Sequence, residues 1–350
     1  MPTSPREVIE KDLFKVIKQK HGTNIHTFIS EKVTPVAGDI SLENLGVTDI
    51  DLLNEMRRQV EVVVSSAATT KFDERYDVAF AINALGVKHV SSFVNECTNI
   101  KLLLHVSTAY VSGERSGIIL ETPFKMGETL NGKNNLNIKE EKKMILETHR
   151  QLVIEKANEE AISSAMKNFG IQRAKLHGWP NTYVFTKAMG EMLLLEGLRQ
   201  DVSLVVLRPT IITSTYKEPF PGWIEGIKTI DSYIATYARG RTSTFLGDPS
   251  KVLDFVVEYA NMILFGAFNA WYFNVERSIN IIFRFADLYK PYSLITMIFD
   301  DTNLKKLHCI MKESFKDEMK TFFFDAKSIE WEGYFMNIHF PGLVKHSFRK

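Results

Sequence analysis

Three short apolar runs, separated by segments with helical periodicity, constrain the fold of this chain more than any other feature. The runs are rich in β-branched residues and leucine, and they lie at residues 60–64, 101–106 and 202–207. Such runs are typical of buried strands in a parallel sheet. Helical patterns at residues 73–98 and 183–199 lie between them. Strands that alternate with helices in this way predict a doubly wound α/β fold.

The rest of the chain adds fewer strands and more helices. We predict helices over residues 5–20, 49–59 and 138–168 and a short strand over 33–37. We interpret the charged part of the third helix as a solvated surface. After about Lys251 the sequence is rich in aromatic residues and loses the strand–helix alternation, which predicts a mainly helical C-terminal region.

Small or polar residues follow the predicted strands. In parallel sheets, ligands bind beyond the carboxyl ends of the strands, so these positions are the first candidates for a site. They are Gly38-Asp39, Ser65 to Thr70, Ser107-Thr108 and Arg208-Pro209-Thr210.

Tyr183 and Lys187 form the clearest chemical pair in the sequence. They are four residues apart at the predicted start of a helix, a spacing that puts both side chains on one face. A nearby ammonium favours the phenolate and lowers the pKa of a tyrosine. Such a tyrosine can donate a proton to a carbonyl oxygen while a hydride attacks the carbon. The spacing alone is weak, because one chance match is unsurprising among 11 tyrosines.

A hydroxyl at the end of the preceding strand strengthens this interpretation. Ser107 and Thr108 are adjacent, so in an extended segment they point to opposite faces, and only one should reach a substrate. A hydroxyl here can instead cap the following turn. Asp39 can likewise be either a ligand-site residue or a turn former. Arg208 can be either a ligand-site residue or half of a structural ion pair.

Composition and charge exclude several function classes. The net charge of +1 gives no whole-chain field to attract nucleic acid or a membrane. Two cysteines, Cys97 and Cys309, are too few for a disulfide framework and favour a reducing compartment. No metal-ligand spacing occurs, and residues 1–7 lack the apolar core of a signal peptide. The apolar run at 262–275 is too short to span a bilayer, so we interpret it as a buried helix or a membrane-surface contact.

Longer blocks of sequence resemble the plant alcohol-forming fatty acyl-CoA reductases, in the extended branch of the short-chain dehydrogenase/reductase superfamily. The resemblance covers nearly the whole chain. The blocks are SAATTKFDERYDVAFAIN (66–83), HVSTAYVSG (105–113), ETPFKMGETLNGK (121–133), AKLHGWPNTYVFTKAMGE (174–191), LRPTIITSTYKEPFPGWIEG (207–226), RFADLYKPY (284–292), FFDAKSIEW (323–331) and YFMNIHFPGL (334–343).

This resemblance implies NADPH-dependent reduction of a long- or very-long-chain fatty acyl-CoA to a primary alcohol through an aldehyde. By position, Tyr183 would donate the proton, and Lys187 would lower its pKa and bind the nicotinamide ribose. Thr108 would polarise the carbonyl, with Ser107 as the second choice.

The resemblance also implies a set of cofactor-binding residues. Asp39 and Ile40 match the turn beside the adenine. Ala67, Ala68 and Thr69 match the stretch that runs along the cofactor. The domain organisation of the family implies two domains in this chain. They are a truncated Rossmann-like domain at residues 1–253 and a helical fatty acyl-CoA reductase C-terminal domain at 254–350.

The chain departs from the family in two places. It has no glycine-rich T-G-x-x-G-x-x-G turn, whose backbone N–H groups bind the pyrophosphate at a helix N-terminus. About one βαβ unit, roughly 30 residues or more, is missing around that turn. A second block is missing after Leu253-Asp254. We therefore predict an incomplete doubly wound parallel sheet and weak or no NADPH binding.

Three functions remain open at this point. The first is the fatty acyl-CoA reductase activity. The second is a degenerate, non-catalytic family member, and the third is another extended short-chain reductase, such as a sugar-nucleotide epimerase. The family favours an intracellular location, at the endoplasmic reticulum membrane surface or in the cytoplasm, with peripheral membrane contact. The sequence does not indicate which oligomeric state the protein adopts.

Overall fold

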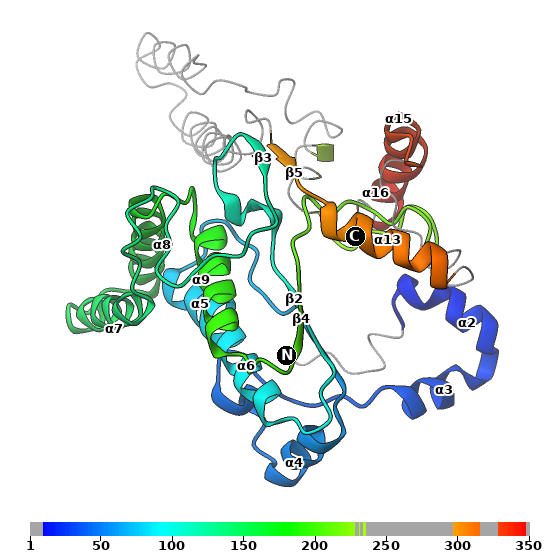
Figure 1. The fold of residues 1–350 in the computed structure, drawn as a ribbon, viewed down its shortest axis with the longest axis horizontal. Coiled ribbons are helices and arrows are strands. Elements are labelled where there is room, and N and C mark those ends of the chain that lie inside the picture. The colour runs from blue at the N-terminus through cyan, green and yellow to red at the C-terminus, as the bar shows by residue number, and fades with distance from the viewer. Residues whose placement is uncertain (1–9, 228–230, 232–233, 236–296, 316–327, 348–350) are drawn as a thin grey trace, which may run out of the picture. The chain divides into compact units, whose positions relative to one another are not determined.

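The computed structural model describes residues 10–227, 231, 234–235, 297–315 and 328–347 (Figure 1). The chain divides into two compact units. We call Asp39–Pro209 with Phe245–Asp300 the sheet unit. We call Met1–Gly38, Thr210–Thr244 and Asp301–Lys350 the helical unit. The predicted domain boundary at residue 253 stays a prediction.

The sheet unit is built on a parallel three-stranded sheet in the order β1-β2-β4. Its strands are β1 (Val62–Ser65), β2 (Leu102–Val106) and β4 (Ser203–Leu207). All three predicted strands are therefore confirmed. Each joins its neighbour through a helical crossover, which is what parallel pairing requires. A second parallel pair joins β3 (Gly117–Ile119) to β5 (Met297–Phe299).

One face of this sheet is covered and the other is not. Ser65, Leu103 and His105 lie on the covered face and are buried. On the opposite face Val64 and Leu207 are 61% and 48% exposed. The expectation of strands buried on both faces is thus met on one face only among the described residues. Within the described sheet, β1 and β4 are the two edges.

A long helical segment and one further helix form the layer over the sheet (Figure 1). The segment consists of α5 (Tyr76–Phe80), the π-helical η4 (Ala81–Leu85) and α6 (Gly86–Glu96). It packs against α9 (Thr182–Gly197). The two approach closely at Gly190, where a Cβ atom would lie 2.2 Å from the Asn83 carbonyl oxygen. A glycine at this position therefore sets the helix spacing.

The remaining helices of the sheet unit are α4 (Ile50–Gln59), α7 (Ile138–Ile154) and α8 (Glu159–Leu176), with short η3 (Glu43–Gly46) and η5 (Ala109–Ser112). The predicted helical region over 138–168 is confirmed, but it consists of two helices with a break between them. Lys156 takes a positive φ of 54°, and Asn158 caps a new helix by accepting a hydrogen bond from the Ala161 N–H at 2.8 Å. Asparagine is a favoured cap, so this signal was present in the sequence.

The described part of the helical unit contains η1 (Asp12–Phe14), α2 (Lys15–His21), η2 (Gly22–Asn24), α3 (Ile25–Lys32), α13 (Thr302–Ser314), α15 (Trp331–Tyr334), the π-helical η7 (Phe335–His339) and α16 (Phe340–Ser347). The predicted strand at 33–37 is wrong, since this segment is irregular. Val33 is 51% exposed, and Pro35 has no N–H to donate to a sheet.

A buried hydrogen-bond chain joins distant segments of the helical unit. The His339 ring contacts Ser214 Oγ through Nδ1 at 3.1 Å and Asp231 Oδ1 through Nε2 at 3.0 Å. The Tyr334 hydroxyl donates to the Ser214 carbonyl oxygen at 2.6 Å. These polar groups are buried and mutually satisfied, so they fix the segment that follows β4 in sequence against η7.

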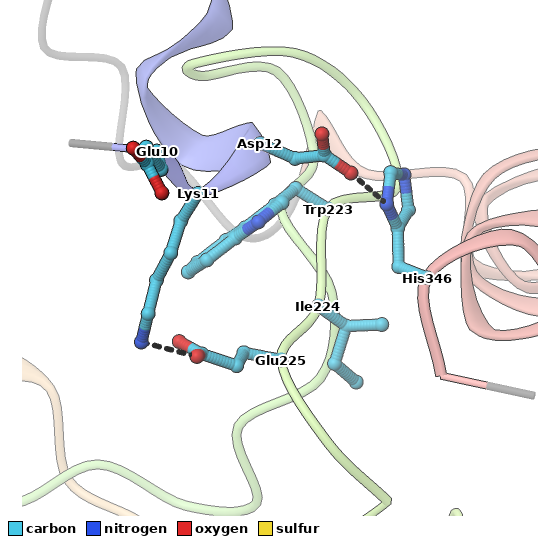
Figure 2. A pocket seen from close by; sticks show the side chains of 7 residues that line it. All are labelled: Glu10, Lys11, Asp12, Trp223, Ile224, Glu225 and His346. Carbon is cyan, nitrogen blue, oxygen red and sulfur yellow. Dashed lines mark hydrogen bonds and ion pairs between the residues drawn. The ribbon is translucent and has the colours of Figure 1, made fainter. Parts of the chain in front are cut away.

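The helical unit also holds an open pocket of about 340 Å³ (Figure 2). Trp223 lies in its wall between two ion pairs, Lys11–Glu225 and His346–Asp12. Its charged groups thus already pair with one another.

Candidate functional site

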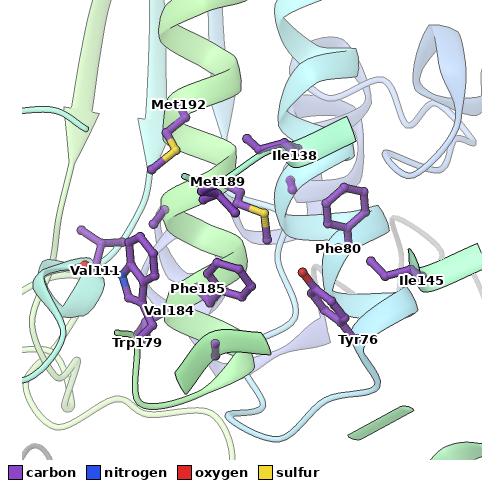
Figure 3. Packing of buried hydrophobic residues seen from close by; sticks show 14 of the residues in the cluster. Tyr76, Phe80, Val111, Ile138, Ile145, Trp179, Val184, Phe185, Met189 and Met192 are labelled. Carbon is purple, nitrogen blue, oxygen red and sulfur yellow. Dashed lines mark hydrogen bonds between the residues drawn. The ribbon is translucent and has the colours of Figure 1, made fainter. Parts of the chain in front are cut away.

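The tyrosine and lysine of the predicted pair lie on α9, whose packing fixes where both side chains point. Asn181 caps the helix by accepting from the Val184 N–H at 3.1 Å. Phe185, Met189 and Met192 anchor one side of the helix in the main core of the sheet unit (Figure 3). Tyr183 is half-buried on the first turn, and its ring stacks on Phe72 at 5.9 Å between centroids.

Thr108 is the strand-end hydroxyl that reaches this tyrosine. It follows β2 in an extended conformation and caps η5, accepting from the Tyr110 N–H at 3.3 Å. The Thr108 side chain also acts on the Tyr183 phenol, lowering its pKa. Ser107 is buried, and its Oγ makes no hydrogen bond to any described residue. Thr108 thus acts on Tyr183, and the choice of Thr108 over Ser107 stays a prediction.

The pKa of Tyr183 differs from the sequence expectation. Burial raises it above the usual value of 10.0, and the Thr108 hydrogen bond offsets only part of that rise. The expected lowering by Lys187 is therefore wrong for this structure. The Lys187 ammonium is directed elsewhere, since its Nζ donates to the Val106 carbonyl oxygen at 2.7 Å.

Lys187 is a buried cation at the end of β2. Its side chain is only 2% exposed. Burial lowers its pKa from 10.5 to about 8, although the nearby Glu191 carboxylate opposes this change. Val106 is its one hydrogen-bond partner among the residues that the structure describes. An ammonium has three N–H donors, so two remain for other groups.

Arg208 forms the structural ion pair that the sequence left open. Its Nε and Nη2 donate to the two carboxylate oxygens of Glu191 at 3.0 and 2.5 Å. This bidentate pair links the end of β4 to α9, one turn beyond Lys187. The ion pair therefore fixes the position of the Glu191 carboxylate, whose charge raises the pKa of Lys187.

The predicted adenine-side residues form a tight turn against α6. The Asp39 carboxylate accepts from the Ser41 hydroxyl at 2.7 Å and the Ser41 N–H at 2.8 Å. These two bonds lower the pKa of Asp39. The Ile40 carbonyl oxygen contacts His89 Nδ1 at 3.0 Å, and the Ile40 side chain packs on Gly86. Asp39 thus acts as a turn former in this structure.

Asn83 connects the predicted cofactor-side loop to α9, and the sequence analysis assigned it no role. Ala67, Ala68 and Thr69 lie in the irregular segment after β1. The Thr69 N–H donates to Asn83 Oδ1 at 3.1 Å, and Asn83 Nδ2 donates to the Thr69 carbonyl oxygen at 3.0 Å. The same Nδ2 reaches Thr186 Oγ1 at 3.1 Å. The helical segment from Tyr76 to Glu96 therefore contacts both predicted cofactor-binding stretches.

A buried hydrogen-bond network around Glu141 packs against α9, and the sequence pattern did not indicate it. Glu141 accepts hydrogen bonds from the Tyr76 hydroxyl at 2.7 Å and Arg173 Nε at 3.0 Å. His177 Nε2 lies 3.2 Å from the same carboxylate. The His177 ring stacks on Phe185 at 5.4 Å. This contact places the His177 ring against the helix that carries Tyr183.

Two searches of the described residues were negative. No cluster of histidine, cysteine, aspartate and glutamate there could hold a metal ion. Among the same residues, no helix is long and apolar enough to cross a membrane. The apolar run at 262–275 lies outside the described residues.

The parallel sheet, the strand-end hydroxyl and the tyrosine–lysine helix define an α/β protein of the short-chain dehydrogenase/reductase class. Two family models, both described as male sterility protein, match the chain. The NAD-binding model matches residues 4–261 and the Sterile model matches residues 255–350.

Curated relatives are similar over almost the whole chain. The "Probable fatty acyl-CoA reductase 4" of Arabidopsis thaliana is 40% identical, with 98% of this chain and 88% of the relative covered. The "Alcohol-forming fatty acyl-CoA reductase" of Simmondsia chinensis is 39% identical, with 97% and 87% covered. This chain belongs to the fatty acyl-CoA reductase family.

The alignments also show a difference in length. The alignment with the Arabidopsis thaliana relative runs over 435 positions, whereas this chain has 350 residues. The relative therefore has internal residues without a counterpart here. Their expected place after Leu253-Asp254 stays a prediction.

Proposed function

We propose that this chain reduces a long- or very-long-chain fatty acyl-CoA to a primary alcohol, with NADPH as reductant and an aldehyde as intermediate. The family supports the substrate class, because relatives are named as alcohol-forming fatty acyl-CoA reductases. The arrangement that carries the proposal is the Tyr183 phenol, whose pKa the Thr108 side chain lowers, with Lys187 buried one turn further along α9.

Tyr183 and Thr108 would act on the carbonyl oxygen of the thioester. Thr108 donates a hydrogen bond that polarises the carbonyl, and Tyr183 transfers its phenolic proton to the oxygen as a hydride reaches the carbon. The resulting thiohemiacetal loses CoA as the thiol and leaves an aldehyde. A second hydride and a second proton convert the aldehyde to the alcohol. The raised pKa of Tyr183 keeps the phenol protonated before transfer but makes it a weaker proton donor, so the reaction needs the Lys187 charge to stabilise the phenolate that forms.

Lys187 would hold the sugar next to the reacting ring and stabilise the phenolate that forms. It keeps two N–H donors beyond the one used by Val106, and these can bind ribose hydroxyls. Its pKa of about 8 leaves it charged at neutral pH.

The nicotinamide end of a dinucleotide fits the residues present better than the phosphate end. A bound NADPH supplies the hydride. Asp39 and Ile40 would lie beside the adenine, and Ala67, Ala68 and Thr69 along the cofactor. The Asn83 hydrogen bonds hold Thr69 in place for this contact. The printed sequence contains no T-G-x-x-G-x-x-G turn, so we assign no residue of this chain to the pyrophosphate.

A second candidate function is a non-catalytic family member that keeps the fold without turnover. The half-exposed outer face of the sheet supports the same possibility. For location, we propose the endoplasmic reticulum surface or the cytoplasm, with peripheral membrane contact.

The decisive test supplies acyl-CoA to cells that express the full chain and measures fatty alcohol. We expect alcohol from the native sequence and none from Tyr183→Phe. Tyr216→Phe is the matched control, because Tyr216 lies in the helical unit outside the proposed site. Alcohol that persists in Tyr183→Phe would refute the assigned proton donor. No alcohol from either protein would favour the non-catalytic function.

A further inference from the structure

Phe72 is an aromatic side chain on a turn beyond the carboxyl end of β1. It lies in the irregular segment that leads to α5, and it is half-buried. Among the described residues, the main core of the sheet unit includes Tyr183 at its margin but does not include Phe72. The Phe72 ring stacks on that of Tyr183, with 5.9 Å between the centroids and 19° between the planes. Phe72 therefore contacts the proposed proton donor from outside the core.

Hydrogen bonds hold this turn in place on both sides of Phe72. Thr69 is fixed by its two backbone bonds with the Asn83 side chain. The Thr69 hydroxyl also donates to Glu74 Oε2 at 3.2 Å, which closes the turn across the residues between them. Glu74 Oε1 in turn accepts from the Arg75 N–H at 3.0 Å. The turn is thus ordered without placing the Phe72 ring in the core, as is typical of loops that carry binding residues on a rigid scaffold.

We propose that Phe72 is a substrate-contacting residue, whose ring packs against the first methylenes of the acyl chain beside the reacting carbonyl. The inference rests on the proposed function, because it takes Tyr183 as the group that meets this carbonyl. Thr108 and Lys187, the side chains assigned to the carbonyl and the sugar, present a hydroxyl and an ammonium. Ligand pockets surround such polar groups with apolar and aromatic side chains, and Phe72 supplies an aromatic surface at the tyrosine itself.

The contact matters most for the aldehyde, because the proposed reaction reduces the same carbon twice. Once the CoA thiol has left, the aldehyde no longer has the contacts that CoA made, and its chain and carbonyl alone hold it. An aromatic wall against the chain keeps the carbonyl carbon next to Tyr183 for the second hydride. Loss of the Phe72 ring should therefore let more aldehyde escape before it becomes alcohol.

The magnitude follows from the apolar surface that the ring would cover. Each methylene removed from water contributes about fourfold to affinity, so two methylenes contribute about fifteenfold. Phe72→Ala should raise the Kd of hexanoyl-CoA and of palmitoyl-CoA by about this factor. Acetyl-CoA has only a methyl group at this place, so its Kd should change by less than about twofold. Phe72→Leu keeps an apolar side chain and should recover most of the lost affinity.

The experiment measures the Kd of the three acyl-CoA esters by equilibrium dialysis with the full chain, which requires no turnover. The matched control is Phe220→Ala, which removes a half-buried phenylalanine of the helical unit whose ring lies 5.9 Å from that of His346. This control should bind all three esters like the native protein, and circular dichroism checks that each variant keeps its helix content. In the reduction assay, the ratio of free aldehyde to alcohol should rise in Phe72→Ala and stay unchanged in Phe220→Ala.

Four results would overturn the proposal. An equal loss for acetyl-CoA and palmitoyl-CoA would show that the ring only supports Tyr183, and a loss confined to palmitoyl-CoA would place the contact far from the carbonyl. Unchanged affinity for all three esters would remove the contact altogether. Weaker NADPH binding with unchanged acyl-CoA affinity would assign the ring to the nicotinamide instead.

The binding and reduction assays separate this inference from the proposed function. A native chain that shows the expected dependence on chain length but forms no alcohol would refute the proposed function and leave the Phe72 contact standing. Alcohol formation with the same affinities and the same aldehyde ratio in Phe72→Ala would overturn the Phe72 contact alone.

Discussion

Replacing Glu141 with glutamine should lower the free energy of unfolding by about 3 kcal/mol at neutral pH. Glu141 is 1% exposed and is the shared acceptor for Tyr76, Arg173 and His177. Glutamine keeps the shape of the side chain but removes its charge. Arg173 then loses the carboxylate that balances its guanidinium in a largely buried position.

The magnitude comes from the protonation equilibrium of the same group. Burial alone would raise the pKa of Glu141, but hydrogen bonds from His177, Arg173 and Tyr76 outweigh it and lower the pKa from 4.5 to about 2. A shift of this size corresponds to about 3 kcal/mol at 1.36 kcal/mol per pKa unit. The value agrees with the 3–5 kcal/mol, roughly, that breaking a buried ion pair costs.

The pH dependence gives an independent check. The folded-state pKa of Glu141 lies below its unfolded value, so the stabilisation is complete above about pH 4.5 and is lost as the pH falls toward 2. The unfolded chain binds the extra proton in that window. Glu141→Gln has no proton to bind at this position, so its stability should change less over the same range.

Urea unfolding followed by tryptophan fluorescence measures both effects. Trp179 reports on this unit, because it is buried and its ring lies 5.3 Å from that of Phe185. The matched control is Glu147→Gln, an exposed position on the same helix, which should change stability by less than about 0.5 kcal/mol. A loss below about 1 kcal/mol in Glu141→Gln, or an unaltered acid profile, would refute the reasoning.

Three further predictions concern α9 and its surroundings. Burial lowers the pKa of Lys187 from 10.5 to about 8, so the unfolded chain binds more protons between those pH values and stability rises with pH there. Lys187→Met should therefore stabilise the fold by about 3 kcal/mol at pH 7 and abolish that rise in urea titrations. The same variant should lose the reductase activity. Gly190→Ala should lower the free energy of unfolding by about 2 kcal/mol, measured by thermal unfolding, because its Cβ would lie 2.2 Å from the Asn83 carbonyl oxygen. The control Gly197→Ala, whose Cβ would lie 3.2 Å from its nearest atom, should cost less. Equal losses in the two variants would contradict the packing argument. Trp179→Phe should cost 1–3 kcal/mol, roughly, in urea titrations followed by circular dichroism, since it removes the 2.8 Å hydrogen bond from Nε1 to the Val111 carbonyl oxygen; an unchanged midpoint would show that this bond contributes nothing.

The sequence predicted elements where a local pattern and a tertiary partner agreed. The strands around Val63, Leu103 and Val205 formed because their apolar runs found parallel neighbours. The run at 33–37 has similar β-propensity but pairs with no described strand, so it stayed irregular. Strand formation depends on pairing and burial as much as on residue type.

The candidate site divides in the same way. The spacing of Tyr183 and Lys187 was readable because four residues make about one helical turn. The strand-end position indicated Ser107 or Thr108, and only the family resemblance put Thr108 first. The pKa of Tyr183 was not, because burial and the direction taken by the Lys187 side chain outweighed helical proximity.

By itself, the sequence determined the parallel α/β class and the family, because both depend on residue types and patterns at short range. Only the tertiary structure decided which groups meet across long separations. Glu141 lies 65 residues from Tyr76 and 32 from Arg173, and Asn83 lies 103 from Thr186. Such contacts leave no local pattern, because the packing of whole helices sets them and sequence spacing does not.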